Sequence, residues 1–192
     1  MEGDELQRKY NQIYLEIILR YKDYIEQNEN LNVAELPKLI TPTNENVITA
    51  TNKVKSTFDN YSYNSNFLSA AKLAYEFVTV HISHVSLPIE FWLYPSDTIK
   101  CEAGDIFDKA TLLCSMMIAL GNPSTRVISS VKPNDRRFIV YCEFDDAVFA
   151  FDLDRGLIRF DTKEKLIGSL VLKENDDTTA YEFNDKMYES LV

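Results

Sequence analysis

The stretch "GDIFDKATLLCSMMIALGNP", residues 104–123, constrains the fold more than any other segment of the chain. Asp105 stands where a helix N-cap is expected, and Gly121-Asn122-Pro123 ends a helix. Between these signals, apolar residues recur at helical spacing: Ile106, Ala110, Leu113, Met117 and Leu120. We therefore predict a helix over about 106–120 whose apolar face must be buried against other elements.

The segments on either side of this helix indicate an α+β fold. Before it, apolar periodicity predicts helices over about 46–58 and 65–83, and the prolines in 87–99 predict an extended, aromatic segment. After it, β-branched and aromatic residues predict strands over 125–132, 136–144, 147–154 and 155–161, with a tight turn at Asp145-Asp146. A short helix is expected over 162–170 and a helical turn near the end of the acidic tail. Helices followed by antiparallel strands are typical of an α+β domain.

The first 40 residues are predicted to be an N-terminal helix and linker, and residues 41–192 the main domain. Leucine, isoleucine and tyrosine residues recur at helical spacing over about 5–27, and prolines and asparagines follow over 28–46. A tyrosine-rich stripe of this kind is typical of a buried or docking face. We therefore expect this helix to dock on the protein or a partner, and a homo-oligomer through it is one of the possibilities.

The composition excludes several classes of protein. The net charge is −10, from 30 acidic and 20 basic residues, and this opposes binding along a phosphate backbone, so nucleic acid is not an expected partner. The N-terminus lacks the apolar core of a signal peptide, and no apolar run is long enough to span a membrane. Three cysteines without paired spacing favour free thiols in a reducing compartment. Together these features predict a cytoplasmic location.

Residues 70–154 resemble the transglutaminase-like superfamily, which has a papain-like fold. Members typically show an aromatic segment, a G-D-C motif that opens a helix ending in "LG", a strand that begins with histidine, and a later strand that carries aspartate. In this chain "FWLYPSDTI" resembles the aromatic segment, "GDIFDKATLLCSMMIALGNPSTRVI" the helix and following strand, and "RRFIVYCEFDDAVFAFDLD" the last two strands. The resemblance implies a transglutaminase-like core of helices packed on an antiparallel sheet, with an N-terminal helical extension.

The resemblance also implies that the catalytic positions are replaced. The superfamily needs a thiolate at a helix N-terminus, a histidine to take its proton, and an aspartate to orient the histidine. The nucleophile position falls on Ile106, which has no nucleophilic atom. The histidine position falls on Arg137, or on Arg136 or Phe138 if the register slips, and no histidine occurs after residue 84. The aspartate position is Asp152, which is retained.

Two further expectations concern the region around these positions. Arg137 and Asp152 are predicted to lie within about 6 Å of one another, as a guanidinium–carboxylate pair in place of the histidine–aspartate pair. Trp92, Tyr94 and Asp105 are the candidate residues of a remnant cleft.

The expected function is therefore that of a non-catalytic module that binds or scaffolds a protein or an extended peptide, without a cofactor. One alternative is a cysteine hydrolase or acyl transferase with a relocated nucleophile, Cys101, and a second is a structural subunit whose cleft is filled by side chains. Cys114 and Cys142 are expected to be inert. His81 and His84 have no neighbouring carboxylate cluster in the sequence, so no metal site is expected.

Overall fold

The computed structural model describes residues 18–19, 21–23, 33–85, 92–132, 135–170 and 179–191. Its helices are the 3₁₀ helix η1 (Val33–Leu39) and the α-helices α3 (Glu45–Lys55), α4 (Tyr63–Val80), α5 (Pro95–Cys101), α6 (Ile106–Ala119) and α7 (Lys163–Leu170). Its strands are β1 (Ser83–His84), β2 (Ala103–Gly104), β3 (Arg126–Lys132), β4 (Asp135–Phe144), β5 (Ala147–Asp152), β6 (Gly156–Phe160), β7 (Thr179–Phe183) and β8 (Tyr188–Ser190).

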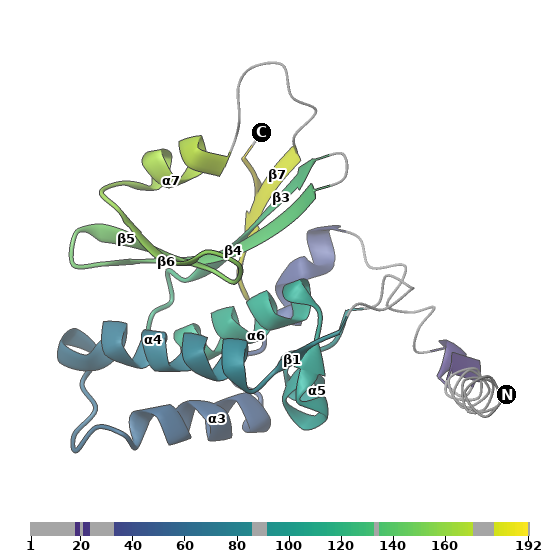
Figure 1. Ribbon diagram of the computed structural model, residues 1–192, viewed down its shortest axis with the longest axis horizontal. Coiled ribbons are helices and arrows are strands. Elements are labelled where there is room, and N and C mark those ends of the chain that lie inside the picture. Colours follow the sequence, from purple (N-terminus) through teal and green to yellow (C-terminus); the bar gives the residue numbers. More distant parts are fainter. Residues whose placement is uncertain are drawn as a thin grey trace, which may run out of the picture.

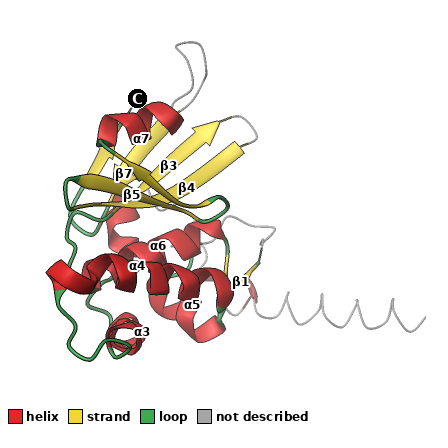
Figure 2. Ribbon diagram, turned by 60° about the vertical axis from the view of Figure 1, so that its left-hand side comes forward, coloured by secondary structure: helices red, strands yellow, loops and turns green. Residues whose placement is uncertain are grey.

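The larger sheet is antiparallel and has the strand order β6-β5-β4-β3-β7-β8. Helix α6 packs between this sheet and the helices α3 and α4, while α7 covers the opposite face of the sheet (Figures 1 and 2). Strands β1 and β2 form a separate parallel pair beside the start of α6. The predicted α+β class is confirmed by this arrangement.

The alternation of side chains divides the sheet into two apolar faces. Val140 and Phe151 belong to the core on the α6 side, whereas Ile139 and Tyr141 belong to the smaller core under α7. Successive residues of a strand point to opposite faces, so a central strand covered on both sides is buried along its whole length. This accounts for β5, in which every residue is buried.

The strand pairs after α6 form as the sequence indicates. Asp145 and Asp146 both have positive φ, of 49° and 52°, and join β4 to β5 by a two-residue turn. Such a turn fixes the register of a hairpin. Asp152 consequently pairs with Ile139.

Two predicted segments differ from the structure. Residues 87–99 were expected to be extended because of Pro88 and Pro95, but α5 (Pro95–Cys101) begins within this segment, with Pro95 at its start. Proline is tolerated there because the first N–H groups of a helix have no intrahelical partner. The expected helical turn in the tail is also wrong: the tail forms β7 and β8, and Phe183 pairs with Val127 in the sheet.

Part of the predicted linker is ordered and buried. Leu36, Leu39 and Ile40, in and after η1, pack in the core on the α6 side, and the Thr41 N–H donates to Ser115 Oγ at 3.0 Å. Most of the helix predicted over 5–27 lies outside the described residues. Of its described part, Leu19 is 58% exposed. The proposed domain boundary at residue 40 stays a prediction.

Candidate functional site

The first turn of α6 is built by a reciprocal pair of carboxylates. Asp105 is the N-cap, and its Oδ1 accepts from the Asp108 N–H at 2.8 Å. Asp108 Oδ2 accepts in return from the Asp105 N–H at 3.0 Å. This capping box satisfies N–H groups that have no partner within the helix. It places Ile106, which the sequence resemblance assigns to the nucleophile position, as the first helical residue, half-buried.

Asp108 also ties the preceding aromatic segment to the helix. Its Oδ1 accepts from the Leu93 N–H at 2.8 Å, and its side chain is almost fully buried. The pKa of Asp108 is raised to about 7. The main cause is burial of the carboxyl group, and the second is the neighbouring charge of Asp105. Gly104 is needed beside it, because a Cβ there would lie 2.9 Å from the Cβ of Asp108.

An aromatic cluster occupies the space between this turn and the sheet. The Phe107 ring lies 4.9 Å from the Trp92 ring and 5.2 Å from the Phe138 ring, between centroids. Trp92 and Tyr94 are half-buried, and the Tyr94 carbonyl caps the start of α5 by accepting from the Asp97 N–H at 2.8 Å. The predicted cleft residues Trp92, Tyr94 and Asp105 therefore lie on the segments that lead into α5 and α6. Their role in a cleft stays a prediction.

The predicted contact between Arg137 and Asp152 is present. Arg137 Nη2 donates to Asp152 Oδ2 at 2.5 Å, and the Asp152 side chain is only 3% exposed. Asp152 Oδ1 accepts from the N–H groups of Asp154 and Arg155, at 2.9 and 3.1 Å. The carboxylate thus holds both the guanidinium and the turn that follows β5.

The ion pair lies on the side of the sheet that faces away from α6. Asp152 pairs with Ile139, which belongs to the core under α7, and Arg137 lies two residues before Ile139 on the same strand. Because side chains alternate along a strand, Arg137 and Asp152 share the α7 side. Phe138, one of the alternatives for the histidine position, packs instead on the α6 side and contacts Phe107. The structure therefore brings Arg137 to Asp152, and Phe138 to the first turn of α6.

The thiols and histidines lie apart from this contact. Cys101 is exposed at the last residue of α5, whereas Cys114 and Cys142 are buried. Burial raises the pKa of the Cys114 thiol and raises the pKa of Cys142 to about 12. His84 lies in β1 opposite Gly104. Within the described residues, no group of three or more metal-ligating side chains comes together.

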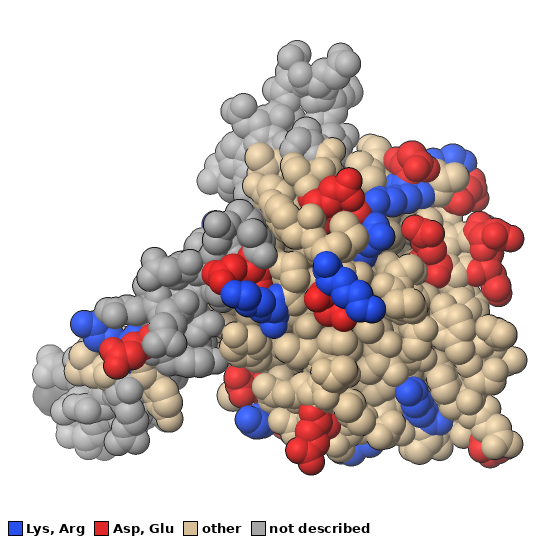
Figure 3. All heavy atoms as spheres, turned by 180° about the vertical axis from the view of Figure 1, so that it is seen from behind, with Lys and Arg blue, Asp and Glu red and all other residues tan. Residues whose placement is uncertain are grey.

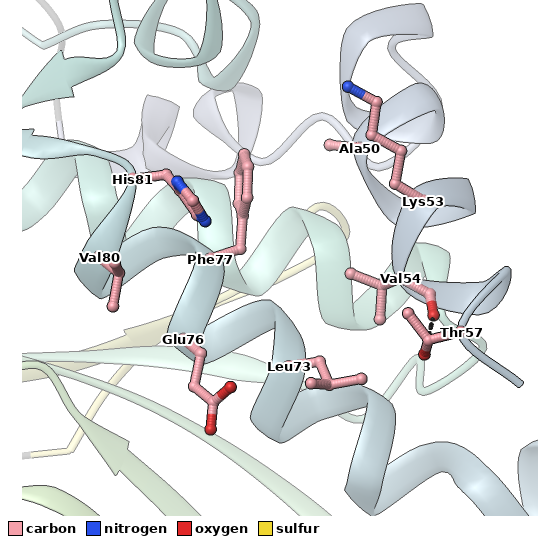
Figure 4. A pocket seen from close by; sticks show the side chains of 9 residues that line it. All are labelled: Ala50, Lys53, Val54, Thr57, Leu73, Glu76, Phe77, Val80 and His81. Atoms are coloured by element: carbon pink, nitrogen blue, oxygen red, sulfur yellow. Dashed lines mark hydrogen bonds between the residues drawn. The ribbon is translucent and has the colours of Figure 1, made fainter.

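A groove that the sequence did not indicate lies between α3 and α4 (Figure 4). It has a volume of about 360 Å³, and Val54, Leu73 and Phe77 line it, with Lys53 and Glu76 at its edges. Val80 is 74% exposed at its end. The signal that could have found it is the helical spacing of Leu73, Phe77 and Val80, which are apolar but are not among the buried residues of α4.

The face of the molecule opposite to the view in Figure 1 carries charges of both signs. On the face shown in Figure 3, lysine and arginine side chains lie among aspartates and glutamates and form no large patch of one sign. Among the described helices, none combines the length and apolar character required to cross a bilayer. That nucleic acid is not a partner stays a prediction from the charge.

Comparison with known proteins relates the chain to solved structures only. No protein-family model matches it, and no curated protein does. An EGTA-treated form of Legionella pneumophila LapG superposes with a TM-score of 0.53 at 14% identity, covering 84% of this chain and 86% of that one. Another LapG structure gives a TM-score of 0.49 at 15% identity, covering 84% and 88%. A putative cysteine protease from Cytophaga hutchinsonii gives 0.48 at 18% identity, covering 85% of this chain and 55% of that one.

At these identities the likeness concerns the fold and not the chemistry. The EGTA-treated LapG structure matches over most of both chains, and its fold is transglutaminase-like. The helices packed on an antiparallel sheet in this chain follow the same arrangement. The chain therefore has the α+β transglutaminase-like fold that its sequence predicts.

Proposed function

We propose that this chain is a non-catalytic domain of the transglutaminase-like fold that acts by binding a protein or an extended peptide. One observation carries the proposal. Where the superfamily brings a thiol and an imidazole together, the first turn of α6 and strand β4 meet through the rings of Phe107 and Phe138. Ile106 opens the helix beside them.

These side chains supply none of the chemistry of a cysteine hydrolase. A thiol must lose a proton to an adjacent base before it attacks a carbonyl carbon, and neither isoleucine nor phenylalanine can give or accept that proton. Arg137 cannot replace the base, because a guanidinium stays protonated at neutral pH and this one is paired with Asp152. The retained aspartate thus has a structural partner, and this supports a role without catalysis.

The same region offers a surface for binding. Trp92, Tyr94 and Ile106 are each half-buried, so part of each side chain remains open to a partner. Half-exposed aromatic residues are common at protein interfaces, because they bury a large apolar area at a low cost in conformational entropy. This favours a binding site beside the first turn of α6 over a cleft that is wholly filled by side chains.

The second candidate is a hydrolase or acyl transferase based on Cys101, which is the exposed thiol. Its position is unfavourable for that role. Cys101 ends α5, and the C-terminal end of a helix carries partial negative charge, whereas known thiolate nucleophiles use the positive N-terminal end.

The pH dependence of alkylation separates the two candidates. In the native protein, we expect Cys101 to react with iodoacetamide only slowly below about pH 7, and Cys114 and Cys142 to react only on unfolding. Peptide mass mapping at each pH gives the rate for each cysteine. An Ile106→Cys variant provides a reference thiol at the start of α6. A native Cys101 that reacts below pH 7 at least about tenfold faster than in the unfolded chain would overturn the non-catalytic proposal.

Binding is tested by replacing the side chain at the start of α6. An Ile106→Arg variant should lose the proteins that the wild type captures from its native extract, because it places a charge in the apolar part of the surface. Ile48→Arg is the matched control, since Ile48 is exposed on α3 and lies outside the first turn of α6. A chain that lacks residues 1–30 tests whether the N-terminal helix contributes. Equal capture by the Ile106→Arg variant and the wild type would contradict binding at this surface.

A further inference from the structure

Among the residues that the structure describes, strand β6 forms a free edge of the larger sheet. It pairs with β5 on one side and is the last strand in the sheet order. Leu157 and Ile158 at its centre are 36% and 38% exposed. An exposed apolar edge offers unpaired backbone N–H and C=O groups to another strand, and proteins usually protect such edges. The other edge, β8, is shorter and contacts η1.

The residues of β6 complement themselves when two copies run antiparallel. With Ile158 opposite Ile158 of a second copy, Leu157 lies opposite Arg159, and Gly156 lies opposite Phe160. The flanking residues Arg155 and Asp161 then come together at each end, as two symmetric pairs of opposite charge. Both of these flanking side chains are exposed.

The two neighbouring registers, with the axis one residue away on either side, are less favourable. Along an edge strand, every second residue directs its backbone N–H and C=O groups outward. When two copies of the strand pair, the outward-facing residues of one copy must lie opposite outward-facing residues of the other. This condition is met only when the two-fold axis passes through a residue. An axis through Leu157 places Arg155 opposite Arg159 of the other copy. An axis through Arg159 places the two copies of Arg159 opposite one another. Like charges directly opposite are destabilising in a sheet.

We propose that the chain forms a homodimer through antiparallel pairing of β6 with β6 of a second copy, with Ile158 on the two-fold axis. The pairing joins the two larger sheets into one and covers the exposed side chains of Leu157 and Ile158. Five-residue strands bury less area than a standard stable interface, so the dimer is of the weak, reversible class.

Disulfide trapping tests the pairing and its register together. In a Cys101→Ser background, Ile158→Cys should form a covalent dimer under mild oxidation, because directly opposed residues of antiparallel strands lie at a distance that a disulfide can bridge. Leu157→Cys and Arg159→Cys are matched controls. In this register, the Cα atom of each of these residues lies about 8 Å from the same Cα atom in the second copy, which is too far for a disulfide. Glu189→Cys, on the exposed side of β8, measures random collision.

The outcomes are distinct. At least about tenfold more covalent dimer for Ile158→Cys than for the other three variants supports the proposal. Preferential trapping of Leu157→Cys or Arg159→Cys would overturn the register, and equal trapping of all four would overturn the dimer through β6.

Charge reversal tests the flanking pairs without a covalent bond. Arg155→Asp alone and Asp161→Arg alone should each weaken dimerisation on the order of tenfold, because each creates two like-charge pairs. The double variant should restore it. Asp161 also pairs with Lys165 of its own chain, and Asp161→Arg removes this contact. The double variant lacks the contact as well. Restored dimerisation in the double variant therefore shows that the loss of the Lys165 contact does not cause the weaker dimerisation of Asp161→Arg. Sedimentation at increasing concentration gives the dissociation constant. A wild type that stays monomeric up to about 1 mM, or no restoration, would contradict the proposal.

Discussion

Replacing Glu182 with alanine should lower the free energy of unfolding by about 3 kcal/mol. Glu182 is fully buried in β7 and accepts from three side chains. Arg126 Nη1 and Lys163 Nζ each donate to its Oε1 at 2.7 Å, and the Tyr141 hydroxyl donates to its Oε2 at 2.5 Å. Removing the carboxylate leaves two cations and a hydroxyl without their acceptor. An unpaired charge that is largely removed from water costs more than the pair itself contributes.

The loss of stability in Glu182→Ala should be concentrated at α7. Lys163 is the first residue of this helix, so Glu182 ties the start of α7 to the sheet, while Leu166 and Leu170 pack beneath it. Urea denaturation measures the total change, and hydrogen exchange of residues 163–170 reports on the helix itself.

Two variants serve as controls for Glu182. Lys163→Met should cost only about 1 kcal/mol, because the lysine side chain is 25% exposed and Arg126 still neutralises the carboxylate. Glu182→Gln should lie between the two, since it keeps the shape and one acceptor oxygen. A Glu182→Ala variant as stable as the wild type would show that the cluster contributes no net stability.

The contribution of Asp108 to the stability of the domain should fall between about pH 4 and pH 7. The pKa of Asp108 is about 7 in the folded protein, whereas an aspartate in an unfolded chain titrates near 4. Between these values the folded state holds a proton that the unfolded state has lost, so raising the pH favours unfolding. The contribution is present below about pH 4 and is lost by about pH 7. It amounts to at most about 4 kcal/mol.

A difference measurement isolates this group from the other titrating groups. Asp108→Asn can still accept from the Leu93 N–H but cannot ionise, so wild-type stability minus variant stability should decrease from pH 4 to pH 7. The carboxyl carbon of Asp108, followed by NMR, should titrate near 7. In an Asp105→Asn variant its pKa should be lower, since the charge of Asp105 is the second cause of the shift. A wild-type titration near 4 would contradict this account.

Asp108 also links this titration to the proposed binding surface. Its carboxylate holds both the first turn of α6 and the segment that carries Trp92. A change in its protonation therefore acts on two elements that border Ile106. The effect of pH on binding at this surface can be compared with that of Asp108→Asn.

The sequence by itself determined the elements that depend on local interactions. Helix α6 was predictable because a capping aspartate, a helical apolar period and a glycine stop all agree over one stretch. The β4–β5 hairpin was predictable because a two-residue turn fixes its register, and that register makes Arg137 a diagonal neighbour of Asp152. The early proline of α5 was misread because proline both ends helices and begins them.

Only the tertiary structure decided which sides of these elements meet. Every residue of β5 is buried, so the sequence of this strand shows no alternation from which its α6 side could be identified. The packing of α6 and α7 on opposite faces of the sheet decides which side chains face α6. Phe138 therefore points toward α6, and Arg137 points away from it. Strand β7 likewise depends on pairing with β3, which lies more than 40 residues earlier in the chain. Local propensity does not encode such distant contacts, because their free energy arises only when both partners are in place.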